Sequence, residues 1–399
     1  MFNENPFESS GYGEWPHSIT SITEIGAILL LSFAGHGSTM VGGPSASVRR
    51  YRAKSLIFDA NLDELASDRV SKLTLNFPSI GQWSGLNAAN EHIRTATNGL
   101  ARTYTVELSA EESFATEVDG GYRISVSAHW AVKGPTDRRI LHTPTAISIE
   151  SKRPRPVEEL RILLRQVHGL LCMAYSGYIL AADGTAAPHL KVGTRTTEYW
   201  DQSFMARPSP APIPNLDFPR FTLATIGGIG SLRRWSRLCN SHPRAIEPLI
   251  GPYTHAERSV PVRMLEVASA IEYWVNSHKR VAAWAKSYKP PSLALARHVG
   301  KSFADWTGNS ERWATQFWDT YNALKHEPNS SVDLRWTSIL ADSGELLLKS
   351  AILDRIALNK APSNLILGGS VHDWQLRDSV RKMISIPYKT APHGKRRKR

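Results

Sequence analysis

Residues 18–150 carry short apolar runs that are bounded by Gly, Asn, Asp or Pro. In one run Tyr122, Ile124, Val126 and Ala128 alternate with polar residues, a period-two pattern typical of a strand with one face on a core and one toward solvent. Runs of this texture cover residues 27–35, 53–62, 72–83, 102–110, 122–132 and 145–152. We predict an antiparallel β-rich domain, built as a sandwich or a barrel.

A helical pattern follows these runs. Between about residues 157 and 180, Leu160, Leu164, Val167 and Leu171 belong to an apolar stripe with spacings of three and four. We expect this long helix to dock on the open face of the β-rich domain. Residues 205–220 hold five prolines, which exclude a helix interior or a central strand and predict an extended connector.

The rest of the chain has helical periodicity. Leu265, Ala268, Ile271 and Val275 share one face of a helix predicted over 260–286, a pattern typical of a helical bundle. Further helices are predicted over 229–241, 243–253, 290–306, 310–326 and 343–360.

The predicted fold class is therefore α+β and multidomain. A β-rich antiparallel domain with its packed helix covers 1–220, a helical connector covers 221–258, and an all-α bundle covers 259–388. The remaining residues, 389–399, form a short polar and basic tail that we expect to be disordered.

Charge favours contact with a polyanion. The formal net charge is +12, and because the last five residues are all basic, the other 394 still carry +7 (12 minus 5). Such an excess favours RNA or DNA first and anionic lipid second, although ordinary solubility charge explains it about as well.

Cysteine usage and hydropathy indicate the cellular compartment. Cys172 and Cys239 lie in apolar helical surroundings without the spacing of a zinc site, which predicts a reducing compartment and neither metal nor cofactor. The apolar run at 25–34 is far shorter than the roughly 20 residues that cross a bilayer. The N-terminus does not look like a secretory signal, so we predict a cytoplasmic protein without membrane contact.

The segment WDTYNALKHEPN, residues 318–329, carries the candidate chemistry. Asn322 and His326 are four residues apart on one helix face, and Glu327-Pro328 disfavours further helix, so His326 falls in the last turn. An imidazole there can give and take protons while a 2′-hydroxyl attacks the adjacent phosphate of RNA, a reaction that needs no metal. The alternative is a solvated polar face with a capping histidine.

The same residues resemble a known family. The stretch YNALKH, Tyr321–His326, is similar to the signature of HEPN domains, helical bundles in which an Arg, commonly followed by Asn, precedes a His near a helix end. Residues 260–385 resemble a HEPN domain in layout. Upstream, GEWPHS, LTLNFPSIGQWSG, ISIESKRPRPVEELRILLRQVHGLLCMA and IEPLIGPY resemble the N-terminal domain that precedes HEPN in ApeA-type bacterial anti-phage proteins.

This resemblance implies a metal-independent endoribonuclease of abortive infection, which cuts RNA such as tRNA in a cleft shared by two protomers. It makes His326 the general acid and base and Asn322 a polar helper. Tyr321 stands where the family has Arg, and a phenol cannot clamp a phosphate as a guanidinium does.

Other residues are implied less directly. Lys325 or Arg312 is expected to supply the missing charge toward RNA. Glu272 and His278, on the preceding long helix, are secondary candidates. The alternative implied by Tyr321 is a weakened or inactive relative that binds RNA and dimerises as a scaffold. The phage trigger and any ligand of the β-rich domain are left open.

Overall fold

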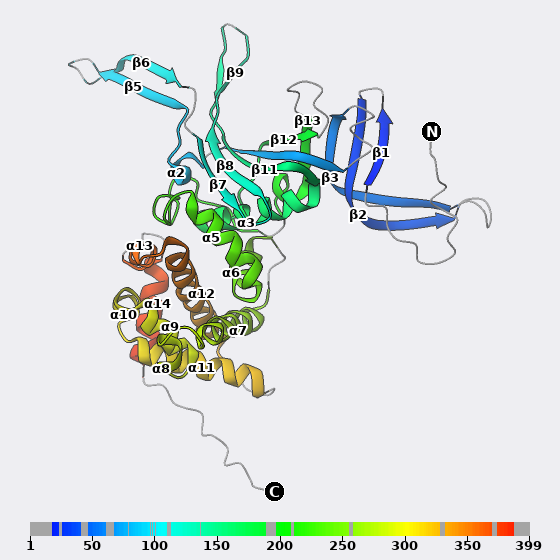
Figure 1. Ribbon diagram of the computed structural model, residues 1–399. Coiled ribbons are helices and arrows are strands. Elements are labelled where there is room, and N and C mark those ends of the chain that lie inside the picture. The colour runs from blue at the N-terminus through cyan, green and yellow to red at the C-terminus, as the bar shows by residue number, and fades with distance from the viewer. Residues whose placement is uncertain are drawn as a thin grey trace.

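The computed structural model describes most of the chain (Figure 1). The described residues are 18–23, 26–40, 47–60, 68–78, 80–95, 97, 99, 101–109, 113–135, 137–188, 197–208, 211–254, 258–327, 332–368 and 373–386. The predicted disordered tail, 389–399, lies outside them.

The N-terminal region is one large antiparallel sheet with two added hairpins. Its strands are β1 (Ser18–Thr23), β2 (Gly26–Met40), β3 (Ser47–Ala60), β4 (Arg69–Phe77), β5 (Ala89–Thr95), β6 (Ala101–Leu108), β7 (Ser113–Val118), β8 (Tyr122–Ala128), β9 (Ala131–Lys133), β10 (Ile140–His142), β11 (Thr145–Pro156), β12 (Asp183–Pro188) and β13 (Thr197–Asp201). Nine of them form the order β1-β2-β3-β13-β12-β4-β11-β8-β7. β5 pairs only with β6 and β9 only with β10 among the described strands.

The expected sandwich or barrel is wrong, and the antiparallel β-rich domain is confirmed. In the part of the chain that the structure describes, β1 and β7 end the sheet without pairing to each other, so the sheet stays open. A helix rather than a second sheet covers its apolar face, because the stripe on that helix supplies the apolar surface that a second sheet would supply in a sandwich.

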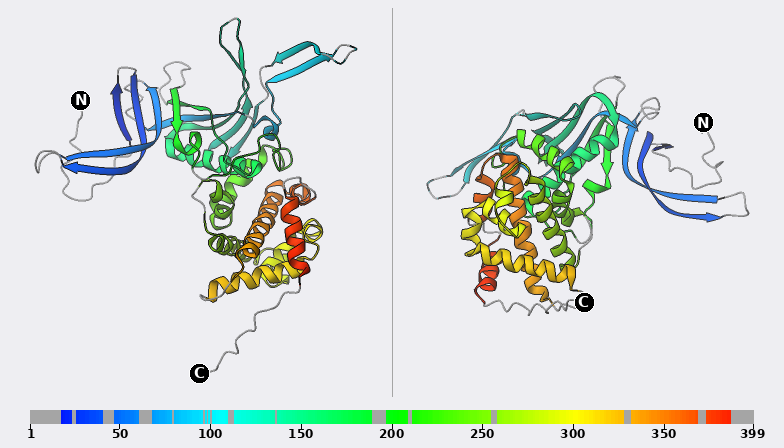
Figure 2. Two further views of the ribbon diagram at one scale, coloured as in Figure 1. Left: turned by 180° about the vertical axis from the view of Figure 1, so that it is seen from behind. Right: turned by 60° about the horizontal axis from the view of Figure 1, so that its bottom comes forward.

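The covering helix is α3 (Val157–Tyr175), which packs on β11 and β4 as expected (Figures 1 and 2). Leu160 and Leu164 on α3 and Leu73 and Ile149 on the sheet are at most 1% exposed. The helix ends five residues earlier than predicted, because Ser176 takes a left-handed φ of 51°. The proline-rich connector passes beside this turn, where the Tyr178 N–H donates a 3.0 Å hydrogen bond to the Pro212 carbonyl.

Helices form the C-terminal region. They include α5 (Gly230–Ser241), α6 (Pro243–Thr254), α7 (Val260–His278), α8 (Trp284–Ser287), α9 (Pro291–Val299), α10 (Lys301–Thr307), α11 (Ser310–His326), α12 (Leu334–Ala357), α13 (Ala361–Leu367) and α14 (Trp374–Ser385). Two short helices, α2 (Gly81–Ser84) and α4 (Gln202–Met205), belong to the β-rich part. None of the helices within the described ranges is both long and apolar enough to span a bilayer.

Two helix predictions in the C-terminal region each span two helices of the structure. The helix predicted over 260–286 ends at His278, and a short helix, α8, follows after a turn. The helix predicted over 290–306 divides into α9 and α10 at Gly300, whose φ of 91° is left-handed and breaks the helical path. The helix predicted over 310–326 has the predicted bounds.

The two regions share one continuous hydrophobic core. α5 contacts both β7 and α12, and α6 contacts α3. The guanidinium of Arg237 on α5 donates two hydrogen bonds of 2.8 Å to the carboxylate of Asp119 beside β7. The helices therefore hold a fixed position below the sheet, while the hairpins β5–β6 and β9–β10 project from the side opposite the helices (Figures 1 and 2).

Candidate active site at the end of helix α11

Helix α11 is anchored along its first three turns. Asn309 caps it by accepting a hydrogen bond from the backbone N–H of Arg312. The rings of Trp313 and Phe317 stack with centroids 5.1 Å apart, and the Trp313 indole N–H donates a 2.9 Å hydrogen bond to Ser343 on α12. Because these side chains are fully buried, the helix direction is fixed by the core.

The last turn of α11 extends beyond this anchor. His326 and Lys325 are exposed and Asn322 is half-buried. Among the described residues, neither Asn322 nor His326 hydrogen-bonds to another side chain. The solvent-facing position predicted for His326 at the end of the helix is therefore what the fold produces.

Tyr321 connects this turn to α7. Its side chain is 2% exposed, and its hydroxyl donates a 3.2 Å hydrogen bond to Glu272 Oε2. Lys325 Nζ in turn donates a 2.9 Å hydrogen bond to the Tyr321 oxygen and lies 5.0 Å from the centre of its ring. The hydrogen bond with Tyr321 raises the pKa of Lys325, so the ammonium stays charged at neutral pH.

Three of the candidates thus form one hydrogen-bonded chain, Glu272–Tyr321–Lys325, whose last member directly precedes His326. The Tyr321 hydroxyl therefore lies between a carboxylate and an ammonium. The contact between Tyr321 and Lys325 joins residues one helical turn apart, whereas the contact between Tyr321 and Glu272 joins two helices that are distant in sequence.

Arg312 does not join this cluster within one chain. Its guanidinium donates to the carbonyl of Ile386, after α14. Fourteen residues separate it from His326, about 21 Å along a helix axis. If Arg312 contacts RNA, it does so at the opposite end of α11.

His278 belongs to a separate group of rings. Its Nδ1 lies 2.8 Å from the carbonyl of Trp274, and its ring is 4.5 Å from the indole of Trp274. Trp284 then stacks on His298 at 4.0 Å. Burial, with the nearby charge of Lys360, lowers the pKa of His298 to about 4, so the His298 ring is neutral at physiological pH.

The end of α11 can therefore offer an accessible imidazole, an amide and one ammonium. Within the described residues, no three His, Cys, Asp or Glu side chains group as metal ligands do. A single protomer supplies one imidazole, so a reaction that needs both a base and an acid calls for a second proton carrier.

Comparison with known proteins identifies the family of the N-terminal region. No curated protein and no solved structure matches the chain. One family model, described as ApeA N-terminal domain 1, matches residues 7–235, more than half of the 399-residue chain. The matched span takes in the whole sheet, α3 and the first half of α5; three of the four stretches quoted for the resemblance lie within it, and IEPLIGPY, residues 246–253, lies beyond it. The chain therefore belongs to the ApeA N-terminal domain 1 family.

Proposed function

We propose that this protein is an anti-phage endoribonuclease of abortive infection, whose HEPN-like helical region cuts RNA at the end of α11. Membership of the ApeA family points to anti-phage defence. The observation that supports the finer proposal is the chain Glu272–Tyr321–Lys325, because it gathers residues of two helices next to the exposed His326.

The proposed reaction uses two protomers. When two α11 ends meet in a homodimer, one imidazole removes the proton of a ribose 2′-hydroxyl, and the oxygen attacks the adjacent phosphorus. The second imidazole protonates the departing 5′-oxygen, which leaves a 2′,3′-cyclic phosphate and a 5′-hydroxyl. The Lys325 ammonium stabilises the charge on the phosphoryl oxygens as a point charge. Asn322 orients the phosphate or the ring.

Purified protein incubated with total tRNA in excess EDTA tests this proposal. Cleavage with cyclic-phosphate ends is expected, and His326→Ala should abolish it. His92→Ala, at an exposed position of β5, is the matched control and should cut like the parent protein. Equal cleavage by the parent and His326→Ala, or none by the parent with phage-infected extract added, would remove the nuclease proposal.

A second function has its own supporting observation. The Tyr321 hydroxyl is engaged on both sides by Glu272 and Lys325, so the position of the family Arg is filled by a buried, uncharged group. This arrangement favours a relative that grips RNA and dimerises with little cleavage.

Tyr321→Arg separates the two functions, and Tyr321→Phe is its control. A guanidinium at this position would face Glu272 and add a second cation beside His326. A large gain in cleavage by Tyr321→Arg alone means that the cleft is intact but weakened. Unchanged cleavage, with RNA binding retained, supports the scaffold.

A further inference from the structure

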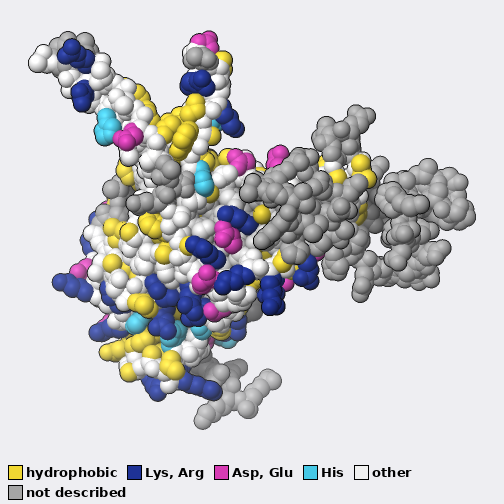
Figure 3. All heavy atoms as spheres, turned by 45° about the horizontal axis from the view of Figure 1, so that its top comes forward, with side chains coloured by type: hydrophobic (Ala, Val, Ile, Leu, Met, Phe, Trp, Pro, Cys, Tyr) yellow, Lys and Arg dark blue, Asp and Glu magenta, His cyan; other side chains and the backbone are white. Residues whose placement is uncertain are grey.

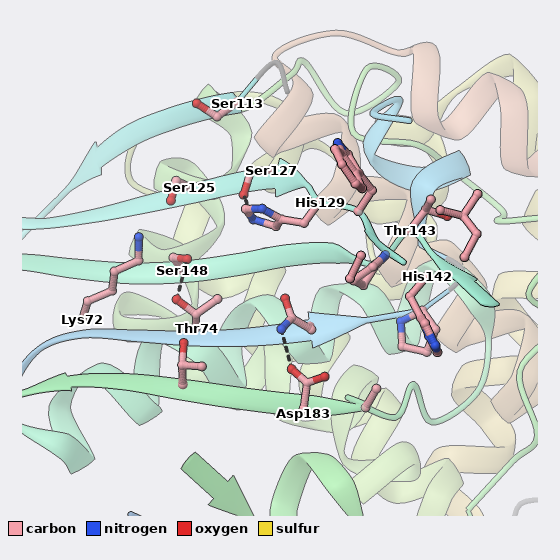
Figure 4. A pocket seen from close by; sticks show the side chains of 18 of the residues that line it. Lys72, Thr74, Ser113, Ser125, Ser127, His129, His142, Thr143, Ser148 and Asp183 are labelled. Atoms are coloured by element: carbon pink, nitrogen blue, oxygen red, sulfur yellow. Dashed lines mark hydrogen bonds between the residues drawn. The ribbon is translucent and has the colours of Figure 1, made fainter. Parts of the chain in front are cut away.

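The face of the sheet that points away from α3 holds an open groove of about 860 Å³ (Figure 4). Its floor is formed by outward side chains of β8, β11, β4 and β12, and one wall by the base of the β9–β10 hairpin. From β7 to β12 the groove spans four strand spacings, about 19 Å.

Hydroxyl groups line the middle of the floor in register. Ser125, Ser148, Thr74 and Thr185 are direct partners across β8, β11, β4 and β12. The Thr74 and Ser148 oxygens are 2.8 Å apart, and Ser148 is 4% exposed (Figure 4). Ser125, Thr74 and Thr185 are half-buried and offer hydroxyl donors and acceptors to a ligand on this face, while the buried Ser148 holds the Thr74 hydroxyl in place.

The charges of the groove favour an anionic ligand. Lys72, Arg123 and Lys133 line it against the two carboxylates of Glu150 and Asp183. Both carboxylates are engaged: Glu150 pairs with Lys72 at 2.7 Å, and Asp183 accepts from the Asn76 amide. Within the described residues, Arg123 and Lys133 form no ion pair and no side-chain hydrogen bond.

The hairpin wall adds rings and further positive charge. Trp130 lines the groove and is 46% exposed, and His129 and His142 lie near it. The His129 ring contacts Ser127 at 2.8 Å. Beyond Lys133, the hairpin continues to exposed Arg138 and Arg139. Figure 3 shows Lys and Arg side chains along both hairpins and, interspersed with Asp and Glu, across the body below them.

We infer that this groove binds single-stranded RNA of a few nucleotides. A base stacks on Trp130, the hydroxyl row and Asn76 contact base edges, and Arg123 and Lys133 contact phosphates. An open sheet face with aromatic and basic side chains is a known type of platform for two or three unpaired bases. The choice of RNA over DNA rests on the proposed function, whereas the site is remote from His326 and its binding is measured without cleavage.

Fluorescence anisotropy with a 5′-labelled 12-nucleotide oligouridylate tests the inference. The parent for these measurements is the full chain carrying His326→Ala, which cannot consume the probe. Adding Trp130→Ala should raise Kd about tenfold, because stacking on one aromatic ring stabilises a bound base by about 1–3 kcal/mol. Trp374→Ala is the matched control, since Trp374 is 51% exposed on α14 and distant in sequence from the groove.

Arg123→Gln and Lys133→Gln test the phosphate contacts separately. Each should lower the salt dependence of binding, the slope of log K against log salt, by about 0.7. Arg280→Gln, at an exposed position between α7 and α8, is their control. Thermal melting of each variant checks that the fold is retained, and oligothymidylate of equal length reports the preference for ribose.

Three results would overturn the inference. The first is a Kd for Trp130→Ala equal to that of Trp374→Ala. The second is complete displacement of RNA by heparin together with no effect of the Trp130→Ala substitution on Kd. The third is quenching of Trp130 fluorescence by a neutral oligosaccharide in a protein that does not bind RNA. Loss of tRNA cleavage in His326→Ala with normal oligonucleotide binding by Trp130→Ala would leave the nuclease proposal standing and reject the groove. Unchanged tRNA cleavage in His326→Ala with a raised Kd for Trp130→Ala would reject the nuclease proposal and leave the groove proposal standing.

Discussion

Two regions of this protein bring together the same four kinds of side chain. Beneath the sheet, Tyr199, Asp201 and Arg161 form one hydrogen-bonded network close to His168. At the end of α11, the corresponding groups are Tyr321, Glu272, Lys325 and His326.

The two sets differ in how deeply their charged side chains are buried. Asp201 is 0% exposed and Arg161 4% exposed, and the Asp201 carboxylate also caps α4 through the Ser203 N–H. Burial opposes the charge on Arg161, but its hydrogen bonds and ion pairs with Asp201 and Glu158 outweigh burial and raise its pKa. Lys325 and His326, by contrast, are exposed. The first set can fix the fold but cannot meet a substrate, whereas the second can meet a substrate and adds little to stability.

Asp201→Ala is expected to have the largest effect in this comparison. It leaves the Arg161 charge buried without its main partner, which costs about 3–5 kcal/mol. Glu272→Ala, the equivalent change at α11, removes one hydrogen bond at a half-buried site and should cost about 1 kcal/mol. Urea unfolding followed by tryptophan fluorescence measures both. Equal losses of stability in the two variants would mean that burial does not separate the regions.

The pH dependence of the free energy of unfolding tests the buried set through His168. Burial lowers the pKa of His168 to about 4, against an ordinary value of 6.5. Because the folded state disfavours the protonated ring, the stability contributed by His168 is complete above pH 6.5 and declines as pH falls toward 4. At 1.36 kcal/mol per pKa unit the loss is about 3 kcal/mol.

His168→Gln isolates this contribution, because an amide can still donate to the Ile179 carbonyl that lies 2.6 Å from the His168 ring. The difference between the urea midpoints at pH 7 and at pH 4.5 should be smaller in the variant than in the parent protein. A parent protein whose midpoint does not change over this range would contradict the buried-imidazole assignment. His298, whose pKa is also lowered to about 4, contributes in the same direction in both proteins.

Lys325→Gln should have the smallest effect on stability and a specific effect on binding. Its ammonium contacts only the Tyr321 ring and hydroxyl among described residues, so the unfolding midpoint should barely change. Removing one phosphate contact lowers the salt slope of RNA binding by about 0.7. Lys286→Gln, at an exposed position on α8, is the control. A changed midpoint with an unchanged salt slope would make Lys325 structural.

Local patterning predicted much of the secondary structure. The alternation at 122–128 and the apolar stripe of α3 follow from periodicity, because each position reports which face of its own element is buried. The predicted bounds of α11, 310–326, are also those of the structure. Besides β1, β5, β7 and β10, which lie outside the predicted runs, the strands β12 and β13 were missed. Their few residues include Gly184 and Pro188, and they pair with strands far away in the sequence, β4 and β3.

The candidate site divides in the same way. The exposure of His326 and its place at a helix end were predictable from the Glu-Pro stop after it. The partner of Tyr321 was not, because Glu272 lies 49 residues away on another helix. The groove was missed as well, although Arg123, Ser125 and Ser127 were visible as the polar half of an alternating strand. Only the registers of four strands align them with Ser148, Thr74 and Thr185.

The sequence by itself determined the division into a sheet region and a helical region, the burial of α3 and the exposure of a histidine at a helix end, since each depends on neighbours within a few residues. Tertiary structure decided that the sheet stays open, that α7 supplies a carboxylate to position 321, and that Arg161 and Asp201 meet in the core. These contacts join residues that are distant along the chain, and their free energies exist only after both partners have been brought together and desolvated.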